Sequence, residues 1–528
     1  MKIKKYIFIL SAFVFLSCGD FLEPKSQHQY IPKDANALQE MLIGEAYPKQ
    51  TNCTFMQFLD VFSDDIAQQV VQGYAFDPSY MSSVKEFTTI FSWQPDMFNK
   101  LREMGISYAN VWENLYAHIL GANAALDYID DVSGSVEEKE FVKAQAHTLR
   151  AFYYYMLVNY YGMPYTFDKT SLGVPLKLDS KMREEGEILM KRNTVEEVYE
   201  QIVLDLSEAE RLFENLPEIK KFNPNYLVNM PMVQLFKSRI ALYMGNWEEA
   251  MLNADKVIKN WKFTLLDLNT IGLPDPGKLN TYTTFNTYDS PEVIWCYGSI
   301  PDLTALFDGS LFLSKQDEGV DGADTRKTFK AADDLILCFQ KGDLRKDRYI
   351  TRELNLNEFS PGESTFYDTY LPYGKYQTSG STPVGGGANA FALSFRLAEA
   401  YLNFSEAAAL NGAEGESKKV LKKLLESRYE GGRVPTDFEA MSGDALMNFI
   451  RNERRKELCF EGQRWFDLRR YGMPSIQHVW DGQKYILNEN DPSYVLPIDR
   501  ETLDRNHMLE QNPIGPQRIG VAIQKKNN

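Results

Sequence analysis

Pairs of helical segments joined by very short turns constrain the fold of this 528-residue chain more than any other feature. In several stretches, apolar residues recur three or four positions apart, which is the spacing of one face of a helix. Four pairs are predicted, at about 108–161, 195–258, 393–427 and 442–470. Within the last range, the apolar spacing is continuous and predicts one long helix from Ser442 to about Arg470. Two of the turns contain Gly245-Asn246 and Asn411-Gly412, residue types that commonly end helices. The chain is therefore predicted to be mainly α-helical, with the helix pairs stacked into a scaffold.

One of these pairs carries the pattern of a known repeat. Residues 241–258 contain Ala241, Ala250 and Ala254 around the Gly245-Asn246 turn. Small residues let two helices approach closely, and glycine tolerates the left-handed conformation of a tight turn. The segment resembles a tetratricopeptide unit, so tetratricopeptide-like helix pairs are the expected form of the scaffold.

An irregular insertion at about 262–392 interrupts the scaffold. It is rich in Asp, Gly, Pro, Ser and Thr, and it contains short β-like pieces such as residues 293–297. Residues 36–261 and 393–528 then form the helical scaffold of a single domain. Irregular segments on a rigid scaffold commonly hold ligands, so a loop and short-strand insertion is one place to expect a binding site.

The first 17 residues have the composition of a secretory signal peptide. Three lysines precede an apolar run over residues 6–16, and a small residue stands before Cys18. The apolar run is too short to cross a bilayer, which takes about 20 residues. Residues 15–18 (FLSC) resemble the lipobox of bacterial lipoproteins, in which the cysteine is acylated and becomes the mature N-terminus. Residues 18–35 are then a lipidated tether, and the alternative is a soluble secreted protein.

Charge narrows the range of partners. The formal net charge is −16, and removal of the three leader lysines makes it about −19. An acidic surface argues against nucleic acid and against docking on anionic lipid, so the expected membrane attachment is through the N-terminal lipid. It also favours neutral or cationic ligands over polyanions, although a local basic pocket could override this preference.

No pattern of metal, cofactor or catalytic chemistry stands out. The cysteines other than Cys18 are widely separated, which favours buried free thiols over a metal site or a disulfide framework. The five histidines have no ligand spacing, and the acids at 317, 321 and 324 lack EF-hand spacing. The neighbours Asp64-Asp65 and Asp333-Asp334 do not indicate the facing carboxylates of a glycoside hydrolase. We expect no catalytic residues, no metal, no cofactor and no enzymatic activity.

Three segments together carry a resemblance to one family. They are residues 149–165 (LRAFYYYMLVNYYGMPY), 395–407 (FRLAEAYLNFSEA) and 451–472 (RNERRKELCFEGQRWFDLRRYG). The later stretch at 496–500 (LPIDR), followed by Asn512-Pro513, also fits. All are similar to the SusD/RagB family of Bacteroidetes outer-membrane lipoproteins, and the resemblance extends from residue 18 to residue 513.

This resemblance implies a lipoprotein of the outer membrane that faces the exterior. Such a protein captures nutrient, usually oligosaccharide, and delivers it to a partner TonB-dependent transporter, the SusC-like subunit. Peptide is the rival ligand, because relatives of the RagB type take peptides. A third alternative is a helical-repeat module that only holds a partner protein.

The dense charge of residues 451–470 is expected to be structural. Acids and bases three or four apart on a helix pair with one another, as Glu453 can with Lys456. Buried arginine–carboxylate pairs are a structural device, and the family resemblance treats this segment as framework. Core roles are likewise expected for Trp295 and for the tyrosines at 153–155, 160 and 161.

The candidate ligand residues are aromatic or amide side chains in loop-like stretches. A sugar packs its C–H face on a flat aromatic ring and forms hydrogen bonds with nearby polar groups. Tyr74, Trp93 and Asn99 precede the first strong helix pair, a region where the family often places ligand-binding residues. Tyr282 and Phe285 in the insertion form a second candidate group. Packing in the core is the alternative for the aromatic candidates.

Overall fold

The computed structural model describes residues 32–48, 56, 58–68, 87–105, 108, 110–181, 189–222, 226–273, 290–298, 312–315, 324–327, 329–356, 364–371, 375, 391 and 393–523. Four of the candidates named above, Cys18, Tyr74, Tyr282 and Phe285, lie outside these residues. Within these ranges, no helix has the length and apolar character needed to cross a membrane.

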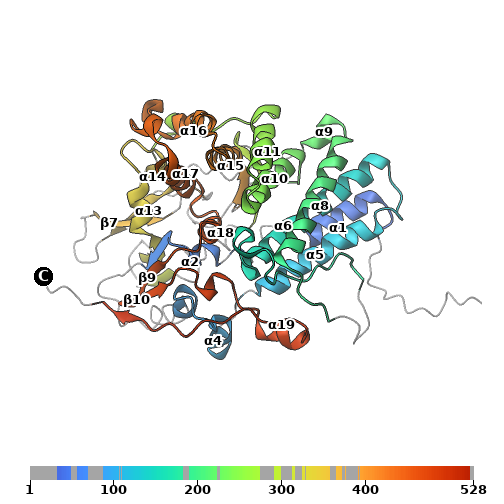
Figure 1. The fold of residues 1–528 in the computed structure, drawn as a ribbon, viewed down its shortest axis with the longest axis horizontal. Helices are drawn as coiled ribbons and strands as arrows, with labels where there is room; N and C mark the ends of the chain where they lie inside the picture. The colour runs from blue at the N-terminus through green and yellow to red at the C-terminus, as the bar shows by residue number, and fades with distance from the viewer. Residues whose placement is uncertain are drawn as a thin grey trace, which may run out of the picture.

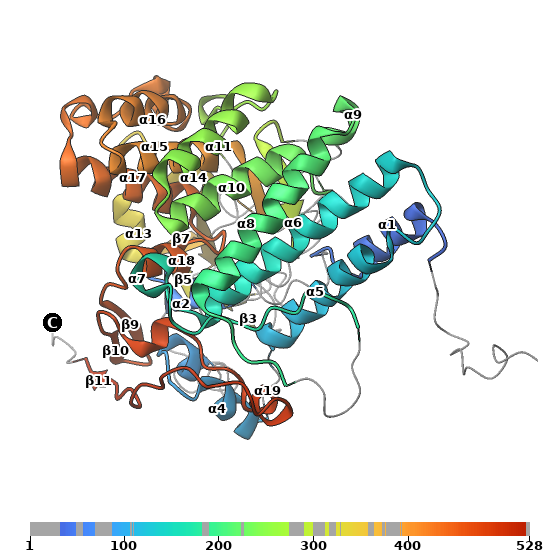
Figure 2. The same cartoon turned by 45° about the vertical axis from the view of Figure 1, so that its right-hand side comes forward.

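Long helices make up most of the molecule and lie side by side (Figures 1 and 2). Consecutive helices pack against each other from α1 through α5, α6, α8, α10, α11 and α15 to α16, and α17 packs against α15. Their bounds are α1 Ala35–Glu45, α5 Val111–Tyr128, α6 Val136–Tyr161, α8 Val195–Glu214, α10 Met230–Met244, α11 Trp247–Asn260, α15 Leu397–Leu410, α16 Glu414–Arg428 and α17 Gly443–Leu458. The prediction of a mainly helical scaffold of helix pairs is confirmed.

Shorter helices connect and flank this stack. They are α2 Leu59–Phe62, α4 Met97–Glu103, α7 Tyr165–Asp168, α9 Glu218–Lys221, α13 Asp333–Cys338, α14 Arg345–Tyr349, α18 Arg464–Arg470 and α19 Arg500–Arg505. Single 3₁₀ turns occur at η3 Leu268–Thr270, η5 Glu430–Gly432, η6 Phe438–Ala440 and η7 Pro492–Tyr494.

Local sequence explains where the long helices begin and end. Ser135 and Thr194 form capping boxes. Each side chain accepts a hydrogen bond from the backbone N–H of the Glu three residues later, and the side chain of that Glu accepts one from the backbone N–H of the capping residue. Asn246 caps α11 by accepting the N–H of Glu249. Gly245 ends α10 in the left-handed conformation, with φ of 77°. A two-residue turn can therefore reverse the chain between α10 and α11.

Small side chains set the close spacing of the helix pairs. The Ser238 hydroxyl of α10 donates to the Ala250 carbonyl of α11 at 2.8 Å. In the next pair, the Ser417 hydroxyl of α16 donates to the Ser405 carbonyl of α15 at 2.6 Å. A side chain larger than serine at these positions would separate the backbones, so the tetratricopeptide-like packing depends on them.

One predicted helix is interrupted. The sequence pattern predicted a single helix over 442–470, but the structure has α17 and α18 with a break between them. Phe460 and Gly462 adopt left-handed φ values of 58° and 67° within the break. A Cβ atom at Gly462 would lie 2.6 Å from Cε of Met56, because α2 packs closely there. The break is therefore set by a tertiary contact that periodicity does not reveal.

The strands form small antiparallel sheets rather than one large one. Their bounds are β1 Ile66–Gln68, β2 Val293–Tyr297, β3 Phe312–Lys315, β4 Asp324–Lys327, β5 Phe329–Ala331, β6 Thr351–Leu356, β7 Ser364–Leu371, β8 Leu393–Arg396, β9 Ile476–Trp480, β10 Gln483–Leu487 and β11 Val521–Ala522. β1 pairs with β5, β2 with β8, β3 with β4 and β6 with β7, while β9, β10 and β11 form a three-stranded sheet. The β2–β8 pair ties the beginning of the insertion to the start of α15.

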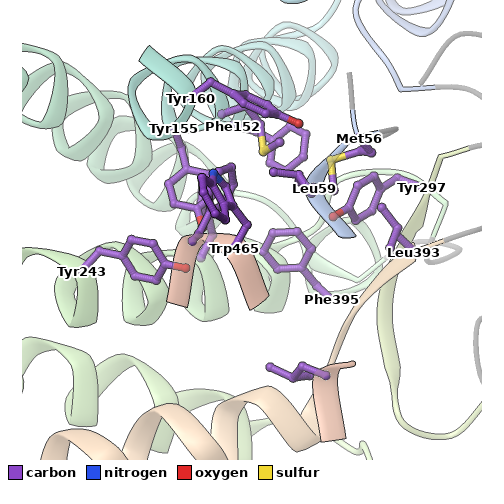
Figure 3. Close-up of a cluster of buried hydrophobic side chains, with 14 of the residues drawn as sticks. Met56, Leu59, Phe152, Tyr155, Tyr160, Tyr243, Tyr297, Leu393, Phe395 and Trp465 are labelled. Carbon is purple, nitrogen blue, oxygen red and sulfur yellow. The ribbon is translucent and has the colours of Figure 1, made fainter. Parts of the chain in front are cut away.

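An aromatic core joins the scaffold to the insertion. Figure 3 shows side chains of α6, β2, β8 and α18 gathered in one cluster. Phe152 of α6 meets Tyr297 of β2 edge-on, with ring centroids 5.4 Å apart. Trp295 is fully buried and stacks on Tyr297 at 4.7 Å. The core roles predicted for Trp295 and for the five tyrosines of α6 are confirmed.

A network of buried ion pairs surrounds Glu457 of α17. Its carboxylate accepts hydrogen bonds from Arg345, Arg396 and Arg428, the shortest at 2.6 Å from Arg396. The network contains five acids and five bases, all buried: Glu292, Asp343, Glu453, Glu457 and Glu461 with Arg345, Lys375, Arg396, Arg428 and Lys456. The charges balance, as buried charges must. The predicted structural role of residues 451–470 is confirmed.

Replacement of Glu457 tests how much the fold depends on this network. We expect Glu457→Gln to lower the free energy of unfolding by about 3 to 5 kcal/mol, because three buried guanidinium groups lose their shared counter-charge. Glu439→Gln is the matched control, since Glu439 pairs with Lys422 at 2.7 Å at the surface. The measurement is urea unfolding of both variants. Equal transition midpoints for the two would contradict the assigned role of Glu457.

Candidate functional site

Trp93 lies in the core and cannot receive a ligand in this structure. Its side chain is fully buried, and its indole N–H donates to the Phe62 carbonyl at 3.0 Å. The expectation that Trp93 stacks on a ligand is therefore corrected. The physical reason is a long-range contact, because the indole ring stacks on His478 of β9 with centroids 4.0 Å apart.

His478 completes this buried stack. Its ring lies between Trp93 and Phe91, with the Phe91 centroid at 3.8 Å. Nδ1 lies 2.7 Å from the Phe91 carbonyl oxygen, and Nε2 lies 2.8 Å from the Ser63 carbonyl oxygen. Burial lowers the pKa of His478 to about 4, although the two carbonyl oxygens act in the opposite direction. The stack is a structural element rather than a binding surface.

Asn99 lies at the surface, beside a small cleft. It is exposed on α4, and the cleft of about 270 Å³ runs between α4 and the segment that leads into α19. Asp499 lines the cleft and is held by Arg102 at 2.8 Å. Among the described residues that line the cleft, the aromatic one is Phe98, and only 5% of it is exposed. The cleft can offer an amide to a ligand but has no open aromatic face.

A larger hollow, which we call the aromatic pocket, lies at the border of scaffold and insertion. It has a volume of about 680 Å³ and is lined by the end of α9, the start of α10, the end of α11 and the start of β2. The lining residues are Glu218, Lys221, Phe222, Met230, Asn260, Trp261, Lys262, Phe263, Ser290, Pro291 and Val293. Its volume lies within the range of about 300 to 1,000 Å³ that is usual for small-molecule sites.

Three aromatic rings form the walls of this pocket. Trp261 and Phe263 are half-buried and pack against the main core. The Trp261 indole N–H donates to the Gln234 side chain at 2.8 Å, which fixes the orientation of the ring. Phe222 is 40% exposed and meets Phe263 edge-on at 5.2 Å. The pocket therefore presents aromatic surface held in place by the protein, as a flat apolar ligand face requires.

Polar groups accompany these rings. The Ser290 hydroxyl is buried and has no hydrogen-bond partner among the described residues. Lys221 pairs with Glu218 at 2.8 Å. Asn260 and Lys262 are exposed beside Trp261. Each can donate a hydrogen bond to a ligand hydroxyl or carboxylate.

Backbone hydrogen bonds and the buried ion pairs hold the two sides of the pocket together. The Thr264 N–H donates to the Pro291 carbonyl at 3.1 Å, which links the Trp261 side to the Ser290 side. The Glu292 carboxylate accepts the Leu266 N–H at 2.9 Å. The same carboxylate pairs with Arg428 at 2.8 Å. The pocket is thus anchored directly to the network around Glu457.

The residues of the aromatic pocket were not among the candidates predicted from the sequence. Its signal in the sequence is the run Asn260-Trp261-Lys262-Phe263, in which aromatic and polar residues alternate just beyond the end of a predicted helix. The opposite walls come from α9 and β2, which are distant in sequence. Tyr74, Tyr282 and Phe285 lie outside the described residues, so their roles stay predictions. No cluster of three or more potential metal ligands occurs in the part of the chain that the structure describes.

Two family models match the chain, one on each side of residue 250. The model described as the SusD family matches residues 280–514. The model described as starch-binding associating with outer membrane matches residues 21–229. The two matches include the segments at 149–165, 395–407 and 451–472 that carried the sequence resemblance.

Two named relatives have low sequence identity to this chain but align with most of its length. SusD-like protein P2 of Formosa agariphila is 24% identical over 425 residues, which is 76% of this chain and 79% of that protein. SusD-like protein P38 of the same organism is 23% identical over 386 residues, which is 68% of this chain and 71% of that protein.

Solved structures show the same fold. A SusD superfamily protein from Bacteroides thetaiotaomicron superposes with a TM-score of 0.65 at 20% identity, over 91% of this chain and 100% of that one. A SusD-like carbohydrate binding protein from Bacteroides vulgatus gives a TM-score of 0.63 at 19% identity, over 90% of this chain and 98% of that one.

Stability measurements separate the two residues that the sequence placed in one site. We expect Trp93→Ala to lower the free energy of unfolding by about 3 to 5 kcal/mol, because it empties a fully buried position. Asn99→Ala should change it by less than about 0.5 kcal/mol, because the side chain is exposed. Urea titration of both variants is the measurement, and a Trp93→Ala protein as stable as wild type would contradict the core assignment.

Proposed function

Because this chain belongs to the SusD/RagB family, we propose that it captures oligosaccharide outside the cell and delivers it to a TonB-dependent outer-membrane transporter. The family consists of binding proteins and not of enzymes. The description of one matching model names both starch binding and association with the outer membrane. A structural neighbour from Bacteroides vulgatus is described as carbohydrate binding, which supports the same ligand class.

The observation that carries the proposal is the aromatic pocket. A pyranose ring has an apolar C–H face and an equatorial rim of hydroxyls, so it needs a flat aromatic surface beside hydrogen-bonding groups. Trp261 and the Phe222–Phe263 pair supply the surface. Asn260 and the Ser290 hydroxyl, which has no partner among the described residues, supply hydrogen-bonding groups within the same hollow. A volume of about 680 Å³ suits a short oligosaccharide rather than a whole polymer.

Capture at a surface does not require tight binding. A lipid on Cys18 would hold many copies of the protein at one membrane, close to the transporter. The high local concentration of binding sites then compensates for weak binding at each one. A ligand that dissociates from one copy meets another copy or the transporter. Moderate affinity also lets the ligand leave for the transporter.

Removal of one pocket wall tests the ligand site. We expect Phe222→Ser to weaken oligosaccharide binding at least about fivefold, because a ring that packs on the sugar contributes about 1 kcal/mol or more. Phe167→Ser is the matched control, since Phe167 is 53% exposed on α7 and does not line the pocket. The measurement is calorimetric titration of the mature domain with a panel of neutral and acidic oligosaccharides.

The outcomes of this titration are distinct. Equal affinity of the two variants would contradict the assignment of the pocket. Binding of peptides with no binding of any oligosaccharide would contradict the ligand class and favour the RagB type of function.

Replacement of Cys18 tests the anchor separately from the ligand site. We expect Cys18→Ala protein to bind oligosaccharide as wild type does but to leave the membrane fraction, because one residue carries the lipid. Cys296→Ala is the control, since Cys296 is a buried cysteine of β2 that is far from Cys18 in the sequence. Cell fractionation in a strain without the transporter is the measurement. Full retention of the Cys18→Ala protein in the membrane there would contradict lipid anchoring.

A further inference from the structure

The charge of the aromatic pocket is opposite in sign to that of the whole chain. The chain carries a formal net charge of −16. Among the described residues that line the pocket, the charged ones are Glu218, Lys221 and Lys262. Glu218 and Lys221 form an ion pair with each other, so the local balance is one positive charge. An acidic protein thus places an ammonium group beside this aromatic hollow.

Lys262 is the source of that charge. It stands between Trp261 and Phe263 in the chain, and its side chain is exposed at the pocket. It forms no ion pair with any described residue, whereas the nearby Lys259 pairs with Asp255 at 2.8 Å. An unpaired ammonium beside aromatic walls is a donor group available to a ligand.

The overall negative charge does not cancel this local preference. At physiological ionic strength, exposed charges are screened beyond about 8 Å, so a bound ligand responds mainly to the groups that line its site. The Glu218 carboxylate is the acid in the described lining, and Lys221 already neutralises it. A neutral sugar gains only a hydrogen bond from Lys262, while an anionic sugar gains a charge-assisted one.

We propose that the aromatic pocket selects acidic saccharides. The sugar ring packs on Trp261 and on the Phe222–Phe263 pair, and its anionic substituent pairs with the Lys262 ammonium. The buried Ser290 hydroxyl bonds to a ring hydroxyl. This inference rests on the proposed saccharide function of the pocket and adds the class of sugar. Lysine acts as a point charge, so a carboxylate and a sulfate both satisfy it.

A matched pair of ligands isolates the charge. Trigalacturonate carries three carboxylates, and its fully methyl-esterified form has the same rings without the charge. Calorimetric titration of the mature domain should give about three- to fivefold tighter binding of the acid than of the ester, the range of a partly exposed ion pair. A sulfated oligosaccharide in a third titration shows whether sulfate is accepted in place of carboxylate.

Two lysine variants assign the preference to one residue. We expect Lys262→Gln to reduce the ratio of acid to ester affinity to below about twofold. Lys259→Gln is the control, because it removes the same charge three residues earlier, at a side chain that is 68% exposed and does not line the pocket. It should leave the ratio unchanged. The acid preference of the wild type should also fall as salt is raised, while binding of the ester should not.

The results separate this inference from the proposed function. Equal affinity of wild type for acid and ester overturns the inference, as does a Lys262→Gln variant that weakens both ligands alike. A wild type that binds neutral oligosaccharides and neither of these probes also overturns it and leaves the proposed function standing. Phe222→Ser should weaken both ligands, and no effect of that variant on either ligand counts against the pocket itself.

Discussion

The arrangement of scaffold and insertion depends on the ion pairs that the buried Glu457 carboxylate forms with three arginines. The arginines come from the insertion, from its junction with α15 and from the end of α16. Their charges hold the pKa of Glu457 well below its usual range. Because none of these groups reaches water, each must find its partner inside the protein, which fixes the position of the insertion on the helices. Glu292 extends the constraint to the pocket, since it pairs with Arg428 and also accepts the Leu266 N–H.

This anchoring explains how a helical stack can carry a binding site. The pocket walls come from α9, α10, α11 and β2, and a sugar site requires that aromatic faces hold still when the ligand is absent. Trp261 is fixed by Gln234, and the segments on either side are joined by the bond from Thr264 to Pro291. The helical stack keeps the pocket rigid, and the first residues of the insertion contribute aromatic and charged side chains to its lining. The charge of Lys262 is opposite in sign to the net charge of the chain, and the composition alone would not suggest the preference for acidic sugars that we propose.

Much of the scaffold could be predicted from the sequence, because its determinants are local. The capping box at Thr194, the Gly245 turn and the apolar periodicity act within a few residues and were visible in the chain. The structural role of the charged segment at 451–470 was also predicted, together with its Glu453–Lys456 pair, although its partners from other segments were not. The break at Gly462 was not predicted, and core packing of Trp93 was predicted only as the alternative to ligand binding, for one shared reason. Each is set by a contact with a residue hundreds of positions away, Met56 in one case and His478 in the other.

The aromatic pocket was harder to predict than the fold, since its walls meet only after the helices have stacked. Asn99 proved to be exposed beside a cleft, while the aromatic pocket is lined by residues that no sequence motif singled out. The most direct test of the central claim is a crystal structure of the mature domain with a bound oligosaccharide. We predict a sugar ring packed on Trp261 and Phe222, with a hydroxyl bonded to Ser290. An ordered oligosaccharide at the cleft beside Asn99, with the aromatic pocket empty, would contradict the account.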